Sequence, residues 1–387
     1  MNREPHIRRC LVLTLAIASW LGSAHSATAG TDDADLTATF KVVHNGNPRT
    51  GEAIDSGLIV GSDGQLYGIA TQGGAANCGT AFRMEPDGHV TVLHSFDRST
   101  DIPTGLVQAP DGDFYGTTFY GGDFGYGTAF RMTPQGEVTV LHSFQLATDG
   151  AWPASLTLGS NGEFYGTTSY NEALEGAGTI FRLSANGDFT LLHSFHYGRQ
   201  DGAMPNRLIQ ADNGKLYGTT MVGGAKGKGT FFSTTPEGEL TVLHSFTGDD
   251  GKTPWGGLAP GTDGQFHGVA REGGPRRLGT LYNVTLDGEV SLLYAYEDVS
   301  EGEKPSSLML GRDGNFYGTT DAGGAHSVGT VFRMTPGGKL TVLHSFLGAD
   351  GEYPGGQLVE LGDGEFFGTT STGGANGDGT IYRIRVK

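Results

Sequence analysis

The chain has 387 residues, of which 67 are glycine and only two are cysteine, and its formal net charge is −17. An acidic protein repels nucleic acid and anionic membranes, so the composition argues against either as a general partner. Two cysteines exclude a disulfide-rich scaffold, and frequent glycine together with 10% aromatic residues is typical of short strands joined by tight turns.

The first 29 residues have the features of a secretory signal peptide. Three arginines precede an apolar run from Leu11 to Leu21, which is too short to span a bilayer as a helix. Small residues follow, with candidate cleavage sites ending at Ser26 or Ala29. No second hydrophobic segment follows, so we expect a secreted protein, extracellular or periplasmic, without a membrane span.

A unit of about 50 residues then occurs seven times. Its consensus is D-G-x-F-Y-G-T-T-x-x-G-G-A-x-x-x-G-T-x-F-R-x-x-P-x-G-x-x-T-V-L-H-S-F. Each copy predicts four strands, which in the sixth copy cover residues 307–311, 316–320, 329–334 and 340–346, separated by Asp-Gly and Pro-Gly-Gly turns. Four antiparallel strands cannot bury both faces alone, but seven such sheets packed around an axis can.

The two ends of the repeat region complement each other. The seventh copy stops eight residues after Gly379 and lacks its "HSF" strand, whereas "TATFKVVHNG" near the N-terminus matches that strand with no repeat before it. We therefore predict one all-β domain, residues 30–387, that forms a seven-bladed β-propeller. Residues 36–46 complete the last blade with residues 351–387, so that the ring has no open seam.

The pattern "YGTT…GGA…GT.FR…G..TVLHSF" resembles the GloVer tandem-repeat proteins, bacterial surface or secreted proteins with varied C-terminal anchors. The resemblance covers residues 36–387 and rests on seven in-phase copies. It implies a seven-bladed propeller and a surface or secreted location, and it implies no established activity. This chain ends "GTIYRIRVK" without an anchor, so we expect release rather than attachment.

Residues present in every copy are interpreted as structural, because a functional site is usually formed once. The recurring histidine of "HSF" is interpreted as a hydrogen-bonded strand residue, with a metal site or proton relay as the alternative. The fifth copy has His267 at the usual tyrosine position and Tyr294 at the usual histidine position. This exchange suggests the hypothesis that the two positions touch or share a partner.

The loops between strands two and three, and between each fourth strand and the next blade, vary most and are expected to share one face, the default binding face. Basic and aromatic residues of the fourth and fifth copies gather there. The candidate ligand-binding residues are His196, Tyr197, Arg199, Lys226, Lys228, Trp255, Arg271, Arg276 and Arg277. Alternatively, these are solvated charges that pair with acids between Glu297 and Glu303.

Aromatic rings stack on sugars and arginine binds carboxylate or sulfate with two parallel hydrogen bonds, so an acidic polysaccharide is the expected ligand, or another surface component. The leading hypothesis is a binding module. The alternatives are a polysaccharide lyase, with His196, Tyr197, Arg199 and Arg276 recruited to catalysis, and a structural or protein-interaction scaffold. No phosphate loop, nucleophile elbow, zinc spacing or dinucleotide motif occurs, so we expect no metal and no cofactor, and we expect a monomer.

Overall fold

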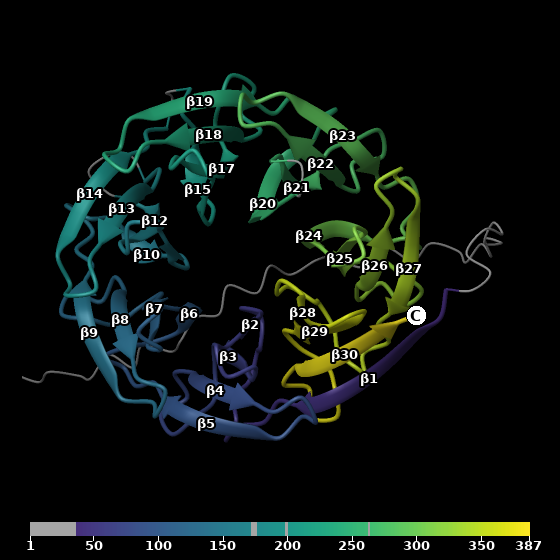
Figure 1. The fold of residues 1–387 in the computed structure, drawn as a ribbon, viewed down its shortest axis with the longest axis horizontal. Helices are drawn as coiled ribbons and strands as arrows, with labels where there is room; N and C mark the ends of the chain where they lie inside the picture. Colours follow the sequence, from purple (N-terminus) through teal and green to yellow (C-terminus); the bar gives the residue numbers. More distant parts are fainter. Residues whose placement is uncertain (1–35, 172–175, 198–199, 262–263) are drawn as a thin grey trace, which may run out of the picture. The chain divides into compact units, whose positions relative to one another are not determined.

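The repeat units form a ring of antiparallel sheets. In a computed structural model, which describes residues 36–171, 176–197, 200–261 and 264–387, the segment Thr37–Lys387 is one compact unit. It contains seven sheets arranged around an axis, and its described residues include no α-helix (Figure 1). The predicted seven-bladed β-propeller is therefore confirmed.

The first strand of each blade lies nearest the axis and the fourth lies at the rim (Figure 1). Blades one and two are β2 (Leu58–Val60), β3 (Leu66–Ala70), β4 (Thr80–Met84), β5 (Val90–Ser95); and β6 (Pro103–Gln108), β7 (Phe114–Thr118), β8 (Thr128–Met132), β9 (Val138–Ser143). In blades three and four the first strand is split, giving β10 (Ala151–Pro153), β11 (Thr157–Leu158), β12 (Phe164–Tyr170), β13 (Thr179–Leu183), β14 (Phe189–Ser194); and β15 (Ala203–Pro205), β16 (Ile209–Gln210), β17 (Leu216–Val222), β18 (Thr230–Thr234), β19 (Leu240–Ser245). Blades five and six are β20 (Lys252–Pro260), β21 (Phe266–Glu272), β22 (Thr280–Val284), β23 (Val290–Ala295); and β24 (Glu303–Leu310), β25 (Phe316–Ala322), β26 (Thr330–Met334), β27 (Leu340–Ser345).

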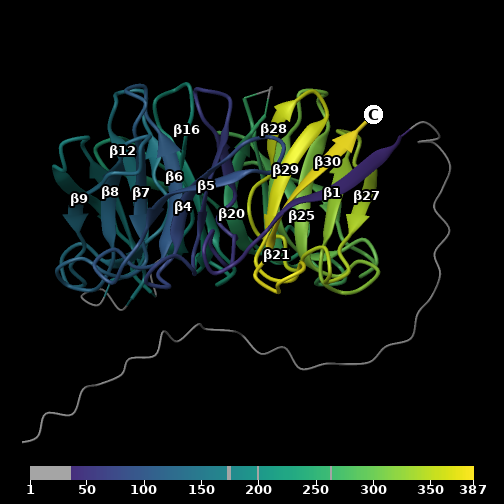
Figure 2. The same cartoon turned by 90° about the horizontal axis from the view of Figure 1, so that it is seen from below.

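The N-terminal strand closes the ring as predicted. Blade seven consists of β28 (Val359–Gly362), β29 (Glu365–Thr370), β30 (Thr380–Val386) and β1 (Ala38–Asn45), which pairs antiparallel with β30 (Figures 1 and 2). The Phe40 ring of β1 stacks on the His344 ring of blade six at 3.6 Å between centroids. The first strand in the chain thus joins the last two blades.

The hydrophobic core lies between the blades as well as inside them. The tyrosine of the F-Y-G-T-T strand packs on the phenylalanine of the next blade's corresponding strand, with ring centroids 4.4 Å apart for Tyr67 and Phe114 and 4.0 Å for Tyr317 and Phe366. His267 makes the same contact with Phe316 at 4.5 Å. His267 therefore occupies a structural position.

The tyrosine and histidine positions do not lie on neighbouring strands of a blade, and that they share a partner remains a hypothesis. In blade five, β22 lies between the strands of His267 and Tyr294, and it pairs with them at different residues, Asn283 and Leu281. Tyr294 forms a side-chain hydrogen bond with Glu301, seven residues on, as the usual histidines do with an aspartate. Each substitution is therefore accommodated locally.

Candidate functional site

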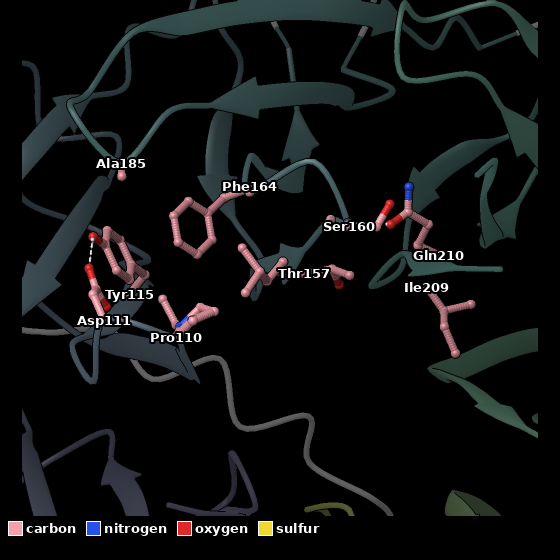
Figure 3. A pocket seen from close by; sticks show the side chains of 13 residues that line it. Pro110, Asp111, Tyr115, Thr157, Ser160, Phe164, Ala185, Ile209 and Gln210 are labelled. Carbon is pink, nitrogen blue, oxygen red and sulfur yellow. Dashed lines mark hydrogen bonds between the residues drawn. The ribbon is translucent and has the colours of Figure 1, made fainter. Parts of the chain in front are cut away.

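A hollow on the face of the tight turns between first and second strands can be assigned to the repeat framework. It has a volume of about 720 Å³ and lies against blades two to four (Figure 3). Asp111, the one charged side chain among its described lining residues, accepts a hydrogen bond from the Tyr115 hydroxyl at 3.2 Å. The same bond joins Asp63 to Tyr67 and Asp313 to Tyr317, so Asp111 holds a turn.

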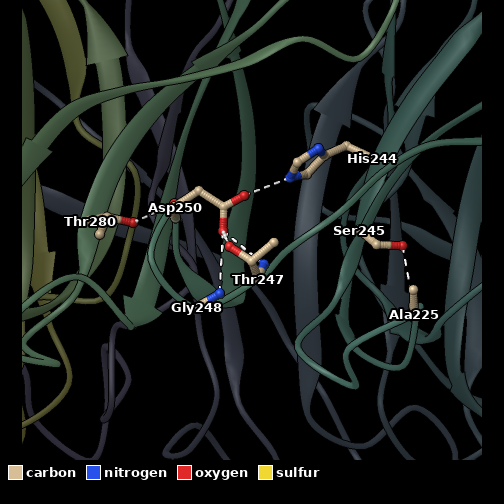
Figure 4. A network of polar contacts seen from close by, with 7 residues as sticks. All are labelled: Ala225, His244, Ser245, Thr247, Gly248, Asp250 and Thr280. Atoms are coloured by element: carbon tan, nitrogen blue, oxygen red, sulfur yellow. Dashed lines mark hydrogen bonds and ion pairs between the residues drawn. The ribbon is translucent and has the colours of Figure 1, made fainter.

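The recurring histidines are also structural. In blades two, three, four and six the histidine Nε2 contacts an aspartate of the loop that leads to the next blade, at 2.7 Å for His244 and Asp250. Asp250 also accepts hydrogen bonds from the Thr247 backbone amide and hydroxyl, both at 2.8 Å (Figure 4). This arrangement ties the rim strand to the following loop. Nowhere in the described residues do three or more His, Cys, Asp and Glu side chains group as metal ligands would.

The Asp250 contact leads to a prediction about acid stability. Burial raises the pKa of Asp250, but hydrogen bonds from His244 and Thr247 outweigh it and bring the pKa from 3.8 to about 2. A depressed folded-state pKa stabilises the fold above the unfolded pKa, and this contribution is lost as the pH falls from about 4 to 2. We expect Asp250→Asn to lower the unfolding free energy by about 2 kcal/mol at pH 6 and by almost nothing at pH 2. Urea denaturation across this pH range tests it, with the exposed neighbour substitution Asp249→Asn as control; a pH-independent difference would contradict the mechanism.

A second recurring feature directs the first strand of each blade to the axis. In six blades, the residue before a proline has a left-handed backbone, for example Trp152 with φ of 58° and Thr253 with φ of 57°. Its amide donates to a carbonyl of the preceding blade, as from Trp152 to Tyr126 and from Thr253 to Lys228. A left-handed conformation is strained for bulky residues, so these bonds between blades maintain the turn.

The segment after this turn lines a cavity on the axis. The cavity has a volume of about 400 Å³, within the range of small-ligand sites, and all seven blades contribute to it. The two residues that follow this proline, or Ile54 in blade one, differ from blade to blade. The residues contributed in this way include Asp55, Ser56, Thr104, Gly105, Ala154, Ser155, Asn206, Arg207, Trp255, Gly256, Ser306, Ser307, Gly355 and Gly356. The repeats thus diverge at the position where they meet.

Two opposite charges line this cavity. Asp55 of blade one and Arg207 of blade four are accessible to solvent inside it, and neither forms an ion pair with any described residue. Enclosure raises the pKa of Asp55 to about 6 and lowers the pKa of Arg207, in both cases because the charged form loses water. Perturbed, unpaired groups in a cavity are typical of functional sites, because a ligand can supply the missing partner.

Trp255 and Arg271, both predicted from the sequence, are brought together beside the cavity. The guanidinium carbon of Arg271 lies 4.5 Å from the centre of the Trp255 ring, and Arg271 forms an ion pair with Asp321 of blade six. Burial raises the pKa of Asp321, whereas Arg271 acts in the opposite direction. Arg271 therefore holds the Trp255 ring and joins two blades, and its charge already has a partner.

A row of aromatic rings begins at the opposite side of the cavity. Phe119 and Trp152 line the cavity and stack in parallel planes with centroids 5.5 Å apart. Tyr120 contacts Phe119 at 4.9 Å, and Tyr170 contacts Trp152 at 5.2 Å. The four rings extend from the axis onto blades two and three.

The remaining predicted residues lie on the loops. Lys226, Arg276 and Arg277 are exposed in the loops between second and third strands, and no ion pair joins them to the acids at 297–303 among the described residues. Lys228 lies against Gly248, His196 is half-buried and Tyr197 is exposed, while Arg199 lies outside the described residues. The predicted cluster is therefore divided between the cavity and the loops of one face.

The comparison with protein families agrees with the repeat pattern. A model for the Gloeobacter/Verrucomicrobia repeat matches residues 54–262 and 204–387. The chain belongs to this repeat family. The predicted resemblance to GloVer repeats is thus confirmed. No curated relative matches the sequence.

Solved structures with low sequence identity share the fold of this Gloeobacter/Verrucomicrobia repeat protein. Virginiamycin B lyase from Staphylococcus aureus is 14% identical with a TM-score of 0.62, over 91% of this chain and 99% of that one. An extracellular domain assigned to a hybrid two-component system of B. thetaiotaomicron is 10% identical with a TM-score of 0.60, over 88% of this chain and 39% of that one. At these identities the similarity concerns the fold alone.

Sequence reasoning missed Asp55, Arg207 and the aromatic row. A signal was present, because Asp55 and Arg207 are the only charged residues in the segments that follow the left-handed turn in the seven copies. It could not be interpreted without knowing that these segments, rather than the longer loops, face the axis.

Proposed function

We propose that this protein is a secreted carbohydrate-binding propeller that accepts an acidic sugar residue in its axial cavity. The observation that carries the proposal is Arg207, whose guanidinium has no ion-pair partner among the described residues and lies in a cavity that also contains Trp152 and Trp255. A guanidinium binds a carboxylate or sulfate through two parallel hydrogen bonds, and indole rings stack on the apolar faces of sugars.

The loops above the cavity would favour the same ligand class. Lys226, Arg276 and Arg277 are exposed on adjacent blades and have no acidic partner among the described residues. In a chain with a net charge of −17, such a basic group attracts anions locally and raises their rate of association. The contribution is expected to weaken as salt is added.

The first test is the affinity for acidic oligosaccharides, measured by calorimetry with galacturonate, glucuronate-containing and sulfated chains and with neutral chains of equal length. Arg207→Ala is expected to lower the affinity for acidic ligands about 10- to 100-fold, because a desolvated charge pair is lost. Arg207→Lys should lower this affinity less. Lys215→Ala removes an exposed charge from the same blade and serves as the control. Equal affinity of the wild type and Arg207→Ala for every acidic chain would contradict the proposal, and no binding at all would favour a scaffold.

A second candidate function is a uronate lyase, favoured by the presence of Asp55 in the same cavity. Its carboxylate would take the C5 proton of a uronate unit while Arg207 neutralises the carboxylate of that unit. The C4–O4 bond would break as the C4–C5 double bond forms, and the proton would pass to the departing O4. Because the pKa of Asp55 is about 6, the base would be mostly ionised at pH 7 and the rate would rise through pH 6.

The ultraviolet absorbance of unsaturated products distinguishes the two candidates. A lyase would generate it, and Asp55→Asn would abolish turnover while leaving ligand affinity within a few-fold. Binding without any change in absorbance would support the binding module alone.

A further inference from the structure

We propose that the aromatic row on blades two and three is a second sugar-binding subsite, so that the ligand is a chain that runs from the axial cavity outward over these blades. This inference rests on the proposed function and deepens it, because it specifies an oligosaccharide or polysaccharide rather than a single acidic sugar. We define the outer subsite as Tyr120, Phe124 and Tyr170, and the cavity-lining rings Phe119 and Trp152 connect it to the axis.

The connection is continuous. Phe119 and Trp152 belong to the cavity wall, and each touches one ring farther out, Tyr120 at 4.9 Å and Tyr170 at 5.2 Å. The amide of Trp152 also donates to the carbonyl of Tyr126, which fixes the loop of blade two against blade three. A ligand seated at the axis therefore meets aromatic surface without a break.

The outer rings are accessible to a ligand. The Tyr120 side chain is 38% exposed and that of Phe124 is 51% exposed. Phe124 occupies the tip of the loop between second and third strands, the position that Lys226 and Arg276 occupy in blades four and five. The exposed aromatic and basic residues thus lie at equivalent positions on one face of the ring.

The framework of the loop does not require these aromatic residues. In five of the other six blades the loop keeps the same pair of glycines, as Gly121 and Gly122 here, and blade three lacks the pair. The tip residues of those five loops are Ala76, Lys226, Arg276, His326 and Asn376. A large exposed apolar side chain has no packing role at such a position, and exposed aromatic clusters indicate binding surfaces. The loop sequence therefore points to a ligand.

The chemistry favours sugar rings over the other planar or apolar ligands. Sugars present CH groups that pack on aromatic faces and hydroxyls that remain in water, and Asp123 between the two exposed rings is an exposed acceptor for hydroxyls. Nucleic acid also stacks on aromatic rings, so single-stranded polynucleotide is the competing ligand in the test below.

The test compares chain lengths. Calorimetry measures the affinity for oligogalacturonates of two and six units. The two-unit chain occupies the cavity alone, and the six-unit chain also reaches the outer subsite. For the wild type we expect the longer chain to bind about tenfold more tightly or better, because at least two more rings are stacked. The double substitution Tyr120→Ala with Phe124→Ala is expected to remove this gain while leaving the affinity for the shorter chain unchanged. Both side chains are exposed, so the variant should remain folded, and thermal melting verifies this.

Two further variants and the possible outcomes separate this inference from the proposed function. Tyr120→Phe keeps the aromatic ring and should keep the tighter binding of the six-unit chain. Leu347 is a 52% exposed apolar residue on the loop after blade six, and Leu347→Ala should change the affinity for neither chain. Equal affinity of the wild type for both chains, or a double variant that retains the gain, overturns the inference alone. A wild type that binds neither chain overturns the proposed function and the inference together. Tighter binding of single-stranded polynucleotide than of the six-unit chain would assign the row to another ligand class.

Discussion

Deleting residues 36–46 is expected to destabilise the whole ring by on the order of 5 kcal/mol or more. The deletion removes β1, its ladder with β30, and the Phe40 ring that stacks on His344. Loss of the half-buried Phe40 ring costs about 1 to 2 kcal/mol, and each lost ladder hydrogen bond adds about 1 kcal/mol. The exposed edge of β30 would also pair with other chains. Urea denaturation followed by tryptophan fluorescence and size-exclusion chromatography measure the two effects.

A circular permutant provides the matched control. The backbone groups of Thr37 and Lys387 exchange hydrogen bonds at 2.9 and 3.1 Å, so a short turn can join Lys387 to Thr37. The permuted chain runs from Asn47 to Lys387, continues through the added turn and ends with residues 37–46. Blade seven then has the same four strands, and its third and fourth strands are joined by a hairpin as in the other blades. The permutant should retain nearly full stability and elute from the size-exclusion column at the same volume as the wild type. If deletion and permutation lower the unfolding free energy equally, the loss of stability in the deletion variant does not come from losing the closure by β1.

Gly229→Ala is expected to cost about 3 to 5 kcal/mol of unfolding free energy. Gly229 has φ of 103°, and an added Cβ would lie 2.4 Å from the Thr220 carbonyl oxygen and 2.6 Å from Cδ of Pro254 in the next blade. Backbone strain contributes about 1 to 3 kcal/mol and overpacking a similar amount. The same glycine-to-proline contact recurs between other blades, as at Gly127 and Pro153, so it is part of the interface between blades.

Gly227→Ala, two residues earlier in the same loop, is the control. Gly227 has φ of 69° and open space around its Cβ direction, and the equivalent residues Arg277 and Ser327 have φ of 62° and 63°. Gly227→Ala should lower the unfolding free energy by about 1 kcal/mol. Urea denaturation of both variants decides the matter: similar losses would show that the contact with Pro254 contributes little.

The fold could be predicted because its information is local and repeated. Each copy carries the Asp-Gly or Asn-Gly turn and the strand around F-Y-G-T-T, and the first six also carry a strand at the H-S-F position, so that seven copies reinforce one interpretation. The spacing of His44 relative to the first repeat also indicated that the N-terminal strand would complete the last blade, and β1 does so. The exchange of His267 and Tyr294 did not reveal that a strand separates the two positions, because residue types carry no information on strand order.

The candidate site was only partly visible in the sequence. Reasoning from loop length and charge found Trp255 and Arg271 but offered only acids between Glu297 and Glu303 as partners, whereas Asp321, 50 residues after Arg271, is the partner. It missed Asp55, Arg207 and the stack of Phe119 on Trp152, because these residues come from different repeats and meet only around the axis.

The sequence by itself therefore determined the number of blades, their strands and the closure of the ring. Turn chemistry and strand propensity act over a few residues, and the sequence carries these local signals in seven copies. Only the tertiary structure decided which variable residues face one another. The left-handed residue before each proline turns the first strand toward the axis, and that turn is held by a hydrogen bond to the neighbouring blade. A contact between blades has no signature within one repeat, so the composition of the axial cavity depends on the assembled ring.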